Sequence, residues 1–199
     1  MGLLRELFGP SKDEIWSQLS QEIGARFTKG DWGQNSKVEL SDKSWTITLN
    51  YVQGKNNSWT IMRAPYVNAD GFRFELYRTG LFTGLGKLLG MQDIEIGDPL
   101  FDEHFVIKSN MEAKVKQLLD PPGIRAHFES APGIHLLVKD DEGWFGATFP
   151  EGVDELSFET NGLIRDIEEL KLLFELFSLL LDQLCRIGSA YEKAPGVRL

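Results

Sequence analysis

Residues 164–187 hold the longest run of apolar residues at helical spacing in the chain. One stripe of this segment consists of Ile167, Leu170, Phe174, Phe177, Leu181 and Leu184. A second stripe beside it consists of Leu172, Leu173, Leu176, Leu179 and Leu180. A helix with two apolar stripes must be covered on two sides, because one face of a sheet buries only one of them. The sequence therefore predicts a long helix between a sheet and a second layer.

Charged residues interrupt this segment at Lys171, Glu175, Asp182 and Arg186. An Asp, Lys or Arg at the centre of a bilayer costs roughly 2.5 to 3.5 kcal/mol, so the segment is unsuited to crossing a membrane. The N-terminal residues also lack the basic region, apolar run and cleavage site of a signal peptide. We therefore expect a soluble protein in the cytoplasm.

Polar and apolar residues alternate in four segments of the first half of the chain, at residues 37–42, 44–52, 58–67 and 72–79. Alternation with a period of two is typical of strands that bury one face. The connections between these segments are short, which favours antiparallel neighbours in a meander. Further strands are expected at residues 134–140, 144–149 and 156–162. The sequence thus predicts an α+β fold in which an antiparallel sheet carries the long helix.

An N-terminal helix should begin at Ser11, which forms the S-x-x-E pattern of a capping box with Glu14. Its buried face is expected to consist of Ile15, Trp16, Leu19, Ile23 and Phe27. Asn110 should cap a further helix that runs to Leu119, and a short helix should follow at residues 124–128.

We expect these elements to form one domain over residues 1–199. Residues 1–10 contain a short apolar hook, and residues 191–199 form a tail that should fray. Both segments are expected to be peripheral to the domain.

The formal net charge of −9 bears on the partners of the chain. A negative surface repels nucleic acid, so we expect no nucleic-acid partner. Ordinary sheet packing explains Trp59, Met62, Arg63 and Tyr66 better than an aromatic and basic platform does. The single cysteine, Cys185, excludes an intramolecular disulfide, and its place in the apolar helix favours a packed thiol over a nucleophile.

One cluster is worth testing as a catalytic or metal site. It consists of Asp93, Glu95, Asp98, Asp102, Glu103 and His104. Oxygen ligands of this kind suit Mg²⁺ or Ca²⁺. However, Asp98 before Pro99 is typical of a turn, and Asp102 and His104 are expected to face solvent from a strand. We favour the turn and the solvent-facing strand, and we predict no bound metal.

Other site patterns are missing from the sequence. The GLGKLLG segment at residues 84–90 lacks the spacing of a phosphate-binding loop. His127 and His135 have no second histidine four residues away, which a zinc-binding helix face requires. The sequence therefore identifies no catalytic residue and no cofactor.

The segment GDPLFDEHFVIKSNMEAKVKQLL begins at Gly97 and precedes a short apolar segment and the Leu-rich helix. Over residues 97–185 this text resembles a family of uncharacterised bacterial domains of unknown function. The resemblance implies no activity, so it assigns no site residue.

Two classes of function remain. The first is a non-enzymatic binding or assembly module, because the long helix is too apolar to stay exposed. The second is a divalent-metal-dependent hydrolase built around residues 93–104. The second apolar stripe must be covered by the N-terminal helix or by a second copy of the chain, and a homodimer would place Leu172, Leu176 and Leu180 at its interface. Membrane-surface contact through residues 3–8 also stays open.

Overall fold

The computed structural model of this protein describes residues 9–31, 35–80, 92–131, 133–140, 149–197 and 199. The strands are β1 (Arg26–Thr28), β2 (Lys37–Asp42), β3 (Trp45–Gln53), β4 (Ser58–Asn68), β5 (Phe74–Arg78), β6 (Gln92–Asp93), β7 (Phe105–Ser109), β8 (His135–Lys139), β9 (Val153–Asn161) and β10 (Ala190–Tyr191). The helices are α2 (Lys12–Ile23), α3 (Pro99–His104), α4 (Glu112–Leu119), α5 (Pro122–Ser130) and α6 (Ile167–Arg186).

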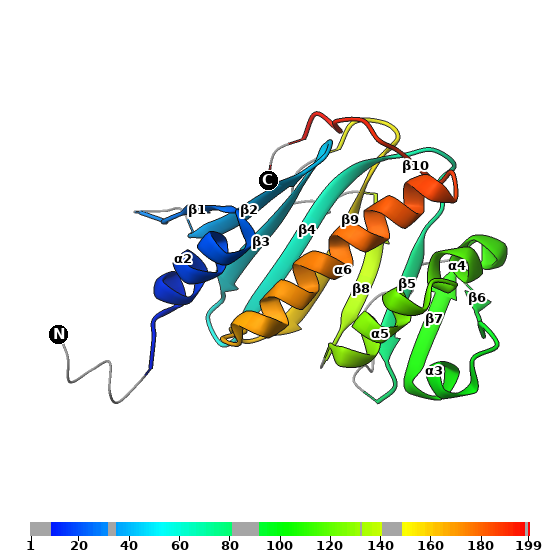
Figure 1. The fold of residues 1–199 in the computed structure, drawn as a ribbon, viewed down its shortest axis with the longest axis horizontal. Coiled ribbons are helices and arrows are strands. Elements are labelled where there is room, and N and C mark those ends of the chain that lie inside the picture. Colours follow the sequence, from blue (N-terminus) through cyan, green and yellow to red (C-terminus); the bar gives the residue numbers. More distant parts are fainter. Residues whose placement is uncertain (1–8, 32–34, 81–91, 132, 141–148, 198) are drawn as a thin grey trace.

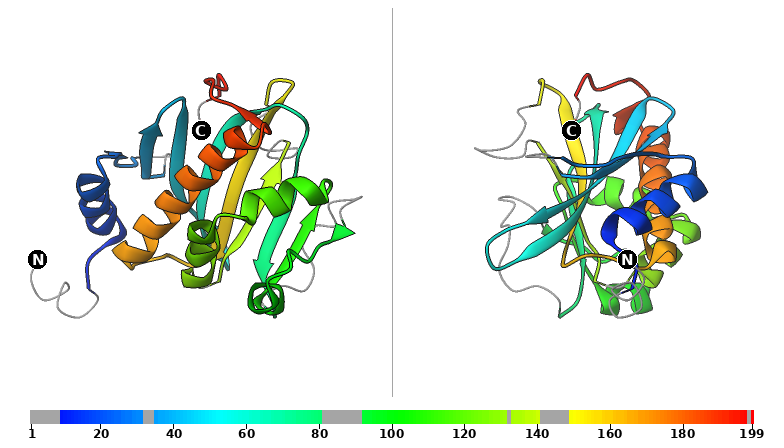
Figure 2. Two further views of the ribbon diagram at one scale, coloured as in Figure 1. Left: turned by 45° about the vertical axis from the view of Figure 1, so that its right-hand side comes forward. Right: turned by 90° about the vertical axis from the view of Figure 1, so that its left-hand side faces the viewer.

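The strands form one antiparallel sheet in the order β1-β2-β3-β4-β9-β8-β5-β7-β6, and β10 pairs with the end of β4 (Figure 1). Helices α2, α4, α5 and α6 lie on one face of this sheet, as the two views in Figure 2 show. The expected α+β fold, with the long helix packed on an antiparallel sheet, is confirmed. No helix within the described ranges is long and apolar enough to cross a membrane.

The strands β2 to β4 form the first part of the expected meander, but β4 and β5 are not neighbours. β4 pairs with β9, and β5 pairs with β8 and β7. The predicted hairpin between them is therefore wrong. Residues 69–73 instead cross the ends of β9 and β8, a distance of about 14 Å at ~4.8 Å per strand, which five extended residues can span.

Arg73, at the end of the segment that crosses from β4 to β5, is hydrogen-bonded to β9. Its guanidinium donates two hydrogen bonds to the Asp154 carboxylate, at 3.1 and 3.2 Å. The side-chain amide of Asn68 donates to the same carboxylate at 2.6 Å. Asp154 is 4% exposed, and a buried carboxylate needs such partners because an unpaired charge is costly to desolvate. The Arg73–Asp154 pair thus joins β5 to β9 across the strand that separates them.

Helix α2 begins with the predicted capping box, in which Ser11 Oγ accepts from the Glu14 N–H at 3.3 Å. It ends earlier than expected. Gly24 is its C-cap with φ of 68°, a conformation that glycine adopts without strain, and Phe27 lies on β1 rather than on the helix. The predicted helical position of Phe27 is therefore wrong.

Two boundaries around α3 and α4 also differ from the prediction. Asp98 caps a short helix, so Asp102 and His104 lie on α3 and the strand begins only at Phe105. Asn110 does not cap α4, because its side chain instead accepts from the Arg73 N–H at 2.8 Å and donates to the Gly71 carbonyl oxygen at 2.8 Å.

Helix α6 begins after Asp166, whose carboxylate accepts from the backbone N–H groups of Glu168 and Glu169. Its first stripe is buried, as predicted: Phe174 is 2% exposed, and Phe177 and Leu181 are fully buried. Helices α2, α4 and α5 of the same chain pack beside it and cover most of the second stripe.

Leu176 and Leu180 are fully buried within the chain, so of the two covers expected for the second stripe the structure favours helices of the same chain. Leu179 is the member of the second stripe that stays exposed, at 39%. The oligomeric state is untested, and the single domain over residues 1–199 stays a prediction.

The tail that the sequence predicted to fray contacts the sheet. Tyr191 pairs with Val67, and Lys37 Nζ donates to the Leu199 carbonyl oxygen at 2.8 Å. After α6 the chain passes over the end of the sheet to the face without helices (Figure 2). Residues 1–8, residues 84–90 and most of the predicted strand at 144–149 lie outside the described residues.

Sheet packing also accounts for the aromatic residues of β4. Met62 and Tyr66 are fully buried in the core, whereas Arg63 lies on the opposite face of the strand. The four residues that suggested a nucleic-acid platform therefore do not share one surface.

Candidate functional site

A groove with a volume of about 600 Å³ opens beside α6. Its lining comes from α2, β2, α5 and α6 and consists of Glu22, Ile23, Leu40, His127, Lys171, Phe174, Glu175, Ser178 and Leu179. Figure 1 shows α2 and α5 on the two sides of α6. The apolar part of the lining includes Leu179, the exposed residue of the second stripe. An apolar floor with polar groups at its edge is typical of a recognition groove.

The rim of this groove is mainly acidic. Lys171 Nζ contacts the carboxylate of Glu22 and lies 2.8 Å from Glu168 Oε1. The hydrogen bonds to Glu168 and Glu22 raise the pKa of Lys171, so its ammonium stays charged. Glu175 lies at the same rim, with its carboxylate 3.4 Å from His127 Nε2. Two carboxylates therefore contact one ammonium group and a third contacts His127, so the rim has a surplus of negative charge and favours a cationic partner.

The face of the sheet without helices carries a row of mostly polar side chains. The strand registers place these residues directly opposite one another from β1 to β7: Arg26, Glu39, Thr48, Arg63, Ser157, Leu137, Glu75 and Lys108. Arg26 and Glu39 form an ion pair at 2.5 Å. Glu75 lies 2.9 Å from His135 Nε2, which belongs to the next row. Charge on this face is therefore largely paired.

Glu155 is the exception on this face. It is fully buried on β9, opposite Pro65 of β4 and Lys139 of β8. Neither of its carboxylate oxygens has a hydrogen-bond partner among the residues that the structure describes. Burial raises the pKa of Glu155 to about 7, although Arg63 and Lys139 act in the opposite direction. The side chain therefore keeps its proton to a higher pH than an exposed glutamate does.

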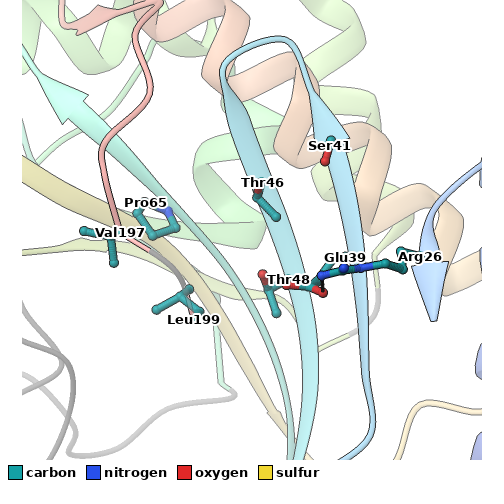
Figure 3. A pocket seen from close by; sticks show the side chains of 8 residues that line it. All are labelled: Arg26, Glu39, Ser41, Thr46, Thr48, Pro65, Val197 and Leu199. Atoms are coloured by element: carbon teal, nitrogen blue, oxygen red, sulfur yellow. Dashed lines mark hydrogen bonds and ion pairs between the residues drawn. The ribbon is translucent and has the colours of Figure 1, made fainter. Parts of the chain in front are cut away.

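A cavity of about 420 Å³ lies on the same face, between the sheet and the C-terminal residues (Figure 3). It is lined by Arg26, Glu39, Ser41, Thr46, Thr48, Pro65, Val197 and Leu199. Thr48 is 1% exposed, and its hydroxyl makes no hydrogen bond with another described residue. The cavity is thus lined by a hydroxyl group that is available to a ligand.

The acidic segment at residues 93–104 does not converge on one point. Asp98 accepts from the Phe101 N–H at 3.3 Å as the cap of α3. Asp102 accepts from the N–H groups of Ile96 and Gly97, at 2.9 and 3.0 Å. Asp93, Glu95, Glu103 and His104 are exposed. No set of three His, Cys, Asp or Glu side chains in the described part of the chain is placed to hold a metal ion.

The remaining candidates from the sequence lie apart from one another. His135 faces Glu75 on the sheet, His127 borders the groove, and Cys185 lies on α6, where burial raises the pKa of its thiol. The sequence prediction missed Glu155, because the predicted strand began only at Leu156. Its alternation with Leu156 and Phe158 was the available signal, since it places Glu155 and Ser157 on the face opposite the core.

No known protein family and no curated protein matches the chain. Among solved structures, the chain is similar to the mycobacterial trehalose monomycolate transport factor A, TtfA, with a TM-score of 0.55 and 10% sequence identity. The similarity covers 90% of this chain and 97% of the other. At this identity the match establishes a shared fold, and it assigns no ligand or activity to this protein.

Proposed function

We propose that this protein is a non-enzymatic binding module that receives an apolar, basic-flanked helix of a protein partner in the groove beside α6. The observation that carries the proposal is the groove itself, which leaves Leu179 exposed over an otherwise buried helix. Grooves between helices commonly accept a third helix, whose apolar residues fill the floor. The acidic rim selects basic residues beside that apolar stripe.

The geometry favours this role over a metal-dependent hydrolase at residues 93–104. Asp98 and Asp102 are engaged with backbone N–H groups, so they are occupied in shaping the turn before α3. The name of the fold neighbour, a transport factor, also supports a binding role. We transfer neither its cargo nor its partners to this chain.

A designed peptide tests the proposal without an identified partner. The probe is an amphipathic helix with a leucine stripe and lysine flanks, and the matched peptide replaces each lysine with glutamate. Fluorescence anisotropy should show saturable binding of the lysine peptide and much weaker binding of the glutamate peptide, because the rim repels the latter.

Two exposed leucines supply matched variants of the protein. Leu179→Asp places a charge on the groove floor and should weaken binding of the lysine peptide by about tenfold or more. Leu100→Asp adds the same charge at a leucine on α3 that is 67% exposed and lies outside the groove, so it should leave the affinity unchanged. Equal affinities for the two variants would show that the peptide binds elsewhere, and would refute the proposed groove.

A further inference from the structure

We propose that the cavity under the C-terminal residues binds a small uncharged polyhydroxylated ligand, such as a mono- or disaccharide. The cavity lies on the helix-free face of the sheet, whereas the groove beside α6 lies on the opposite face. The proposal is therefore independent of the function assigned to the groove. Its volume of about 420 Å³ falls within the range of small-molecule sites.

The sheet side of the cavity carries several neighbouring hydrogen-bonding groups. Ser41 lies directly opposite Thr46, and Glu39 lies directly opposite Thr48, on the neighbouring strands β2 and β3. The three hydroxyls can each donate and accept, and none of them bonds to another described residue. A ligand with several hydroxyl groups matches such a surface, because each of its hydroxyls can donate or accept a hydrogen bond.

The charges of the cavity argue against an ionic ligand. Arg26 Nη2 lies 2.5 Å from Glu39 Oε2, and Lys37 Nζ lies 2.9 Å from Glu39 Oε1. Contacts with Lys37 and Arg26 outweigh burial and lower the pKa of Glu39, which is therefore ionised and paired. Lys37 does not line the cavity, and it also donates to the Leu199 carbonyl oxygen. Among the lining residues, the formal charges of Arg26 and Glu39 cancel, so the cavity keeps hydrogen-bonding capacity with little unpaired charge.

The opposite side of the cavity is apolar. The C-terminal residues Val197 and Leu199 line it, and Pro65 continues the apolar surface on β4, beside the strand that carries the threonines (Figure 3). A sugar ring presents hydroxyls at its edge and C–H groups on its faces, so one ligand can contact both sides of the cavity. Thr48 is central to this recognition because it lines the cavity and its hydroxyl makes no hydrogen bond with another described residue.

Chemical-shift titration of the full ¹⁵N-labelled chain tests the proposal. Glucose, maltose and sodium phosphate are each added up to about 20 mM, which covers dissociation constants into the millimolar range. A sugar should produce saturable shifts of the backbone amides of Glu39, Thr46 and Thr48, and phosphate should not. No saturable shift with either sugar, or saturation of the same amides by phosphate, would overturn the proposal.

Three variants separate binding from folding. Thr48→Val keeps the shape and removes the hydroxyl, so it should weaken sugar binding by about tenfold with an unchanged melting temperature. Thr46→Trp fills the cavity from an exposed position and should abolish the shifts. Ser157→Ala removes a buried hydroxyl of the same face that does not line the cavity, and it should bind like the wild type. Equal weakening by Thr48→Val and Ser157→Ala would also refute the site.

Discussion

Replacing Glu155 by glutamine should remove a pH-dependent loss of stability. Glu155 is fully buried, its carboxylate has no hydrogen-bond partner within the described residues, and burial raises its pKa from 4.5 to about 7. Below pH 4.5 the group is protonated in both the folded and the unfolded chain. As the pH rises from 4.5 to about 7, the unfolded chain releases this proton while the folded chain keeps it, so the folded state loses relative stability.

The size of the effect follows from the pKa difference. A difference of about 2.5 pH units at 1.36 kcal/mol per unit corresponds to roughly 3 kcal/mol of stability lost across the window, as an order of magnitude. Between pH 5 and pH 8, the stability of Glu155→Gln relative to the wild type should therefore rise by about 2 to 3 kcal/mol. Glutamine itself cannot titrate, so any constant cost of burying its amide cancels in this comparison.

Urea denaturation followed by tryptophan fluorescence at pH 5, 6, 7 and 8 measures this difference. Ser157→Ala is the matched control, because it removes a polar group from the same face of β9 that does not titrate in this range. If the free energies of unfolding of the wild type and Glu155→Gln differ by the same amount from pH 5 to pH 8, then Glu155 is ionised in the folded state across this range. That result would refute the reasoning.

Three further predictions follow from the packing. Phe177→Ala should cost about 3 to 5 kcal/mol in urea denaturation, since Phe177 is fully buried on α6; a loss below about 1 kcal/mol would contradict its place in the core. Arg73→Leu should lower the free energy of unfolding by about 2 to 4 kcal/mol, because it removes the cationic partner of the buried Asp154 carboxylate. The double variant Arg73→Leu/Asp154→Leu should recover part of that loss. Light scattering at micromolar concentration should give the mass of one chain, 22.5 kDa, because α2, α4 and α5 already cover the second stripe of α6; a stable mass of twice that value would show a second interface.

The sequence by itself determined the elements whose evidence is local. The 3.6-residue period of α6 and the two-residue period of β2, β3 and β4 each follow from one segment that must bury one side. The capping box at Ser11 is equally local, because both partners lie within one turn. These patterns were sufficient for the α+β class and for the prediction that α6 needs cover on two sides.

Predictions from local patterns were wrong where a residue or strand was bound by a partner from a distant part of the sequence. Asn110 looked like a helix cap, but its side chain bonds to the backbone of residues 71 and 73. The turn after β4 looked like a hairpin, yet β9 provides a longer partner for β4 than β5 does. Both outcomes depend on contacts between residues far apart in sequence, which no local pattern records.

Only the tertiary structure decided where the candidate sites lie. The second stripe of α6 predicted an apolar surface, but Leu40 and His127 reach the groove from β2 and α5, elements whose positions depend on the whole sheet. The cavity on the other face joins residues of β1 to β4 with Val197 and Leu199, and Glu155 becomes buried only in the assembled fold. Burial and pKa are properties of the surroundings of a side chain, so the chemistry of both faces emerges only once the strands are ordered.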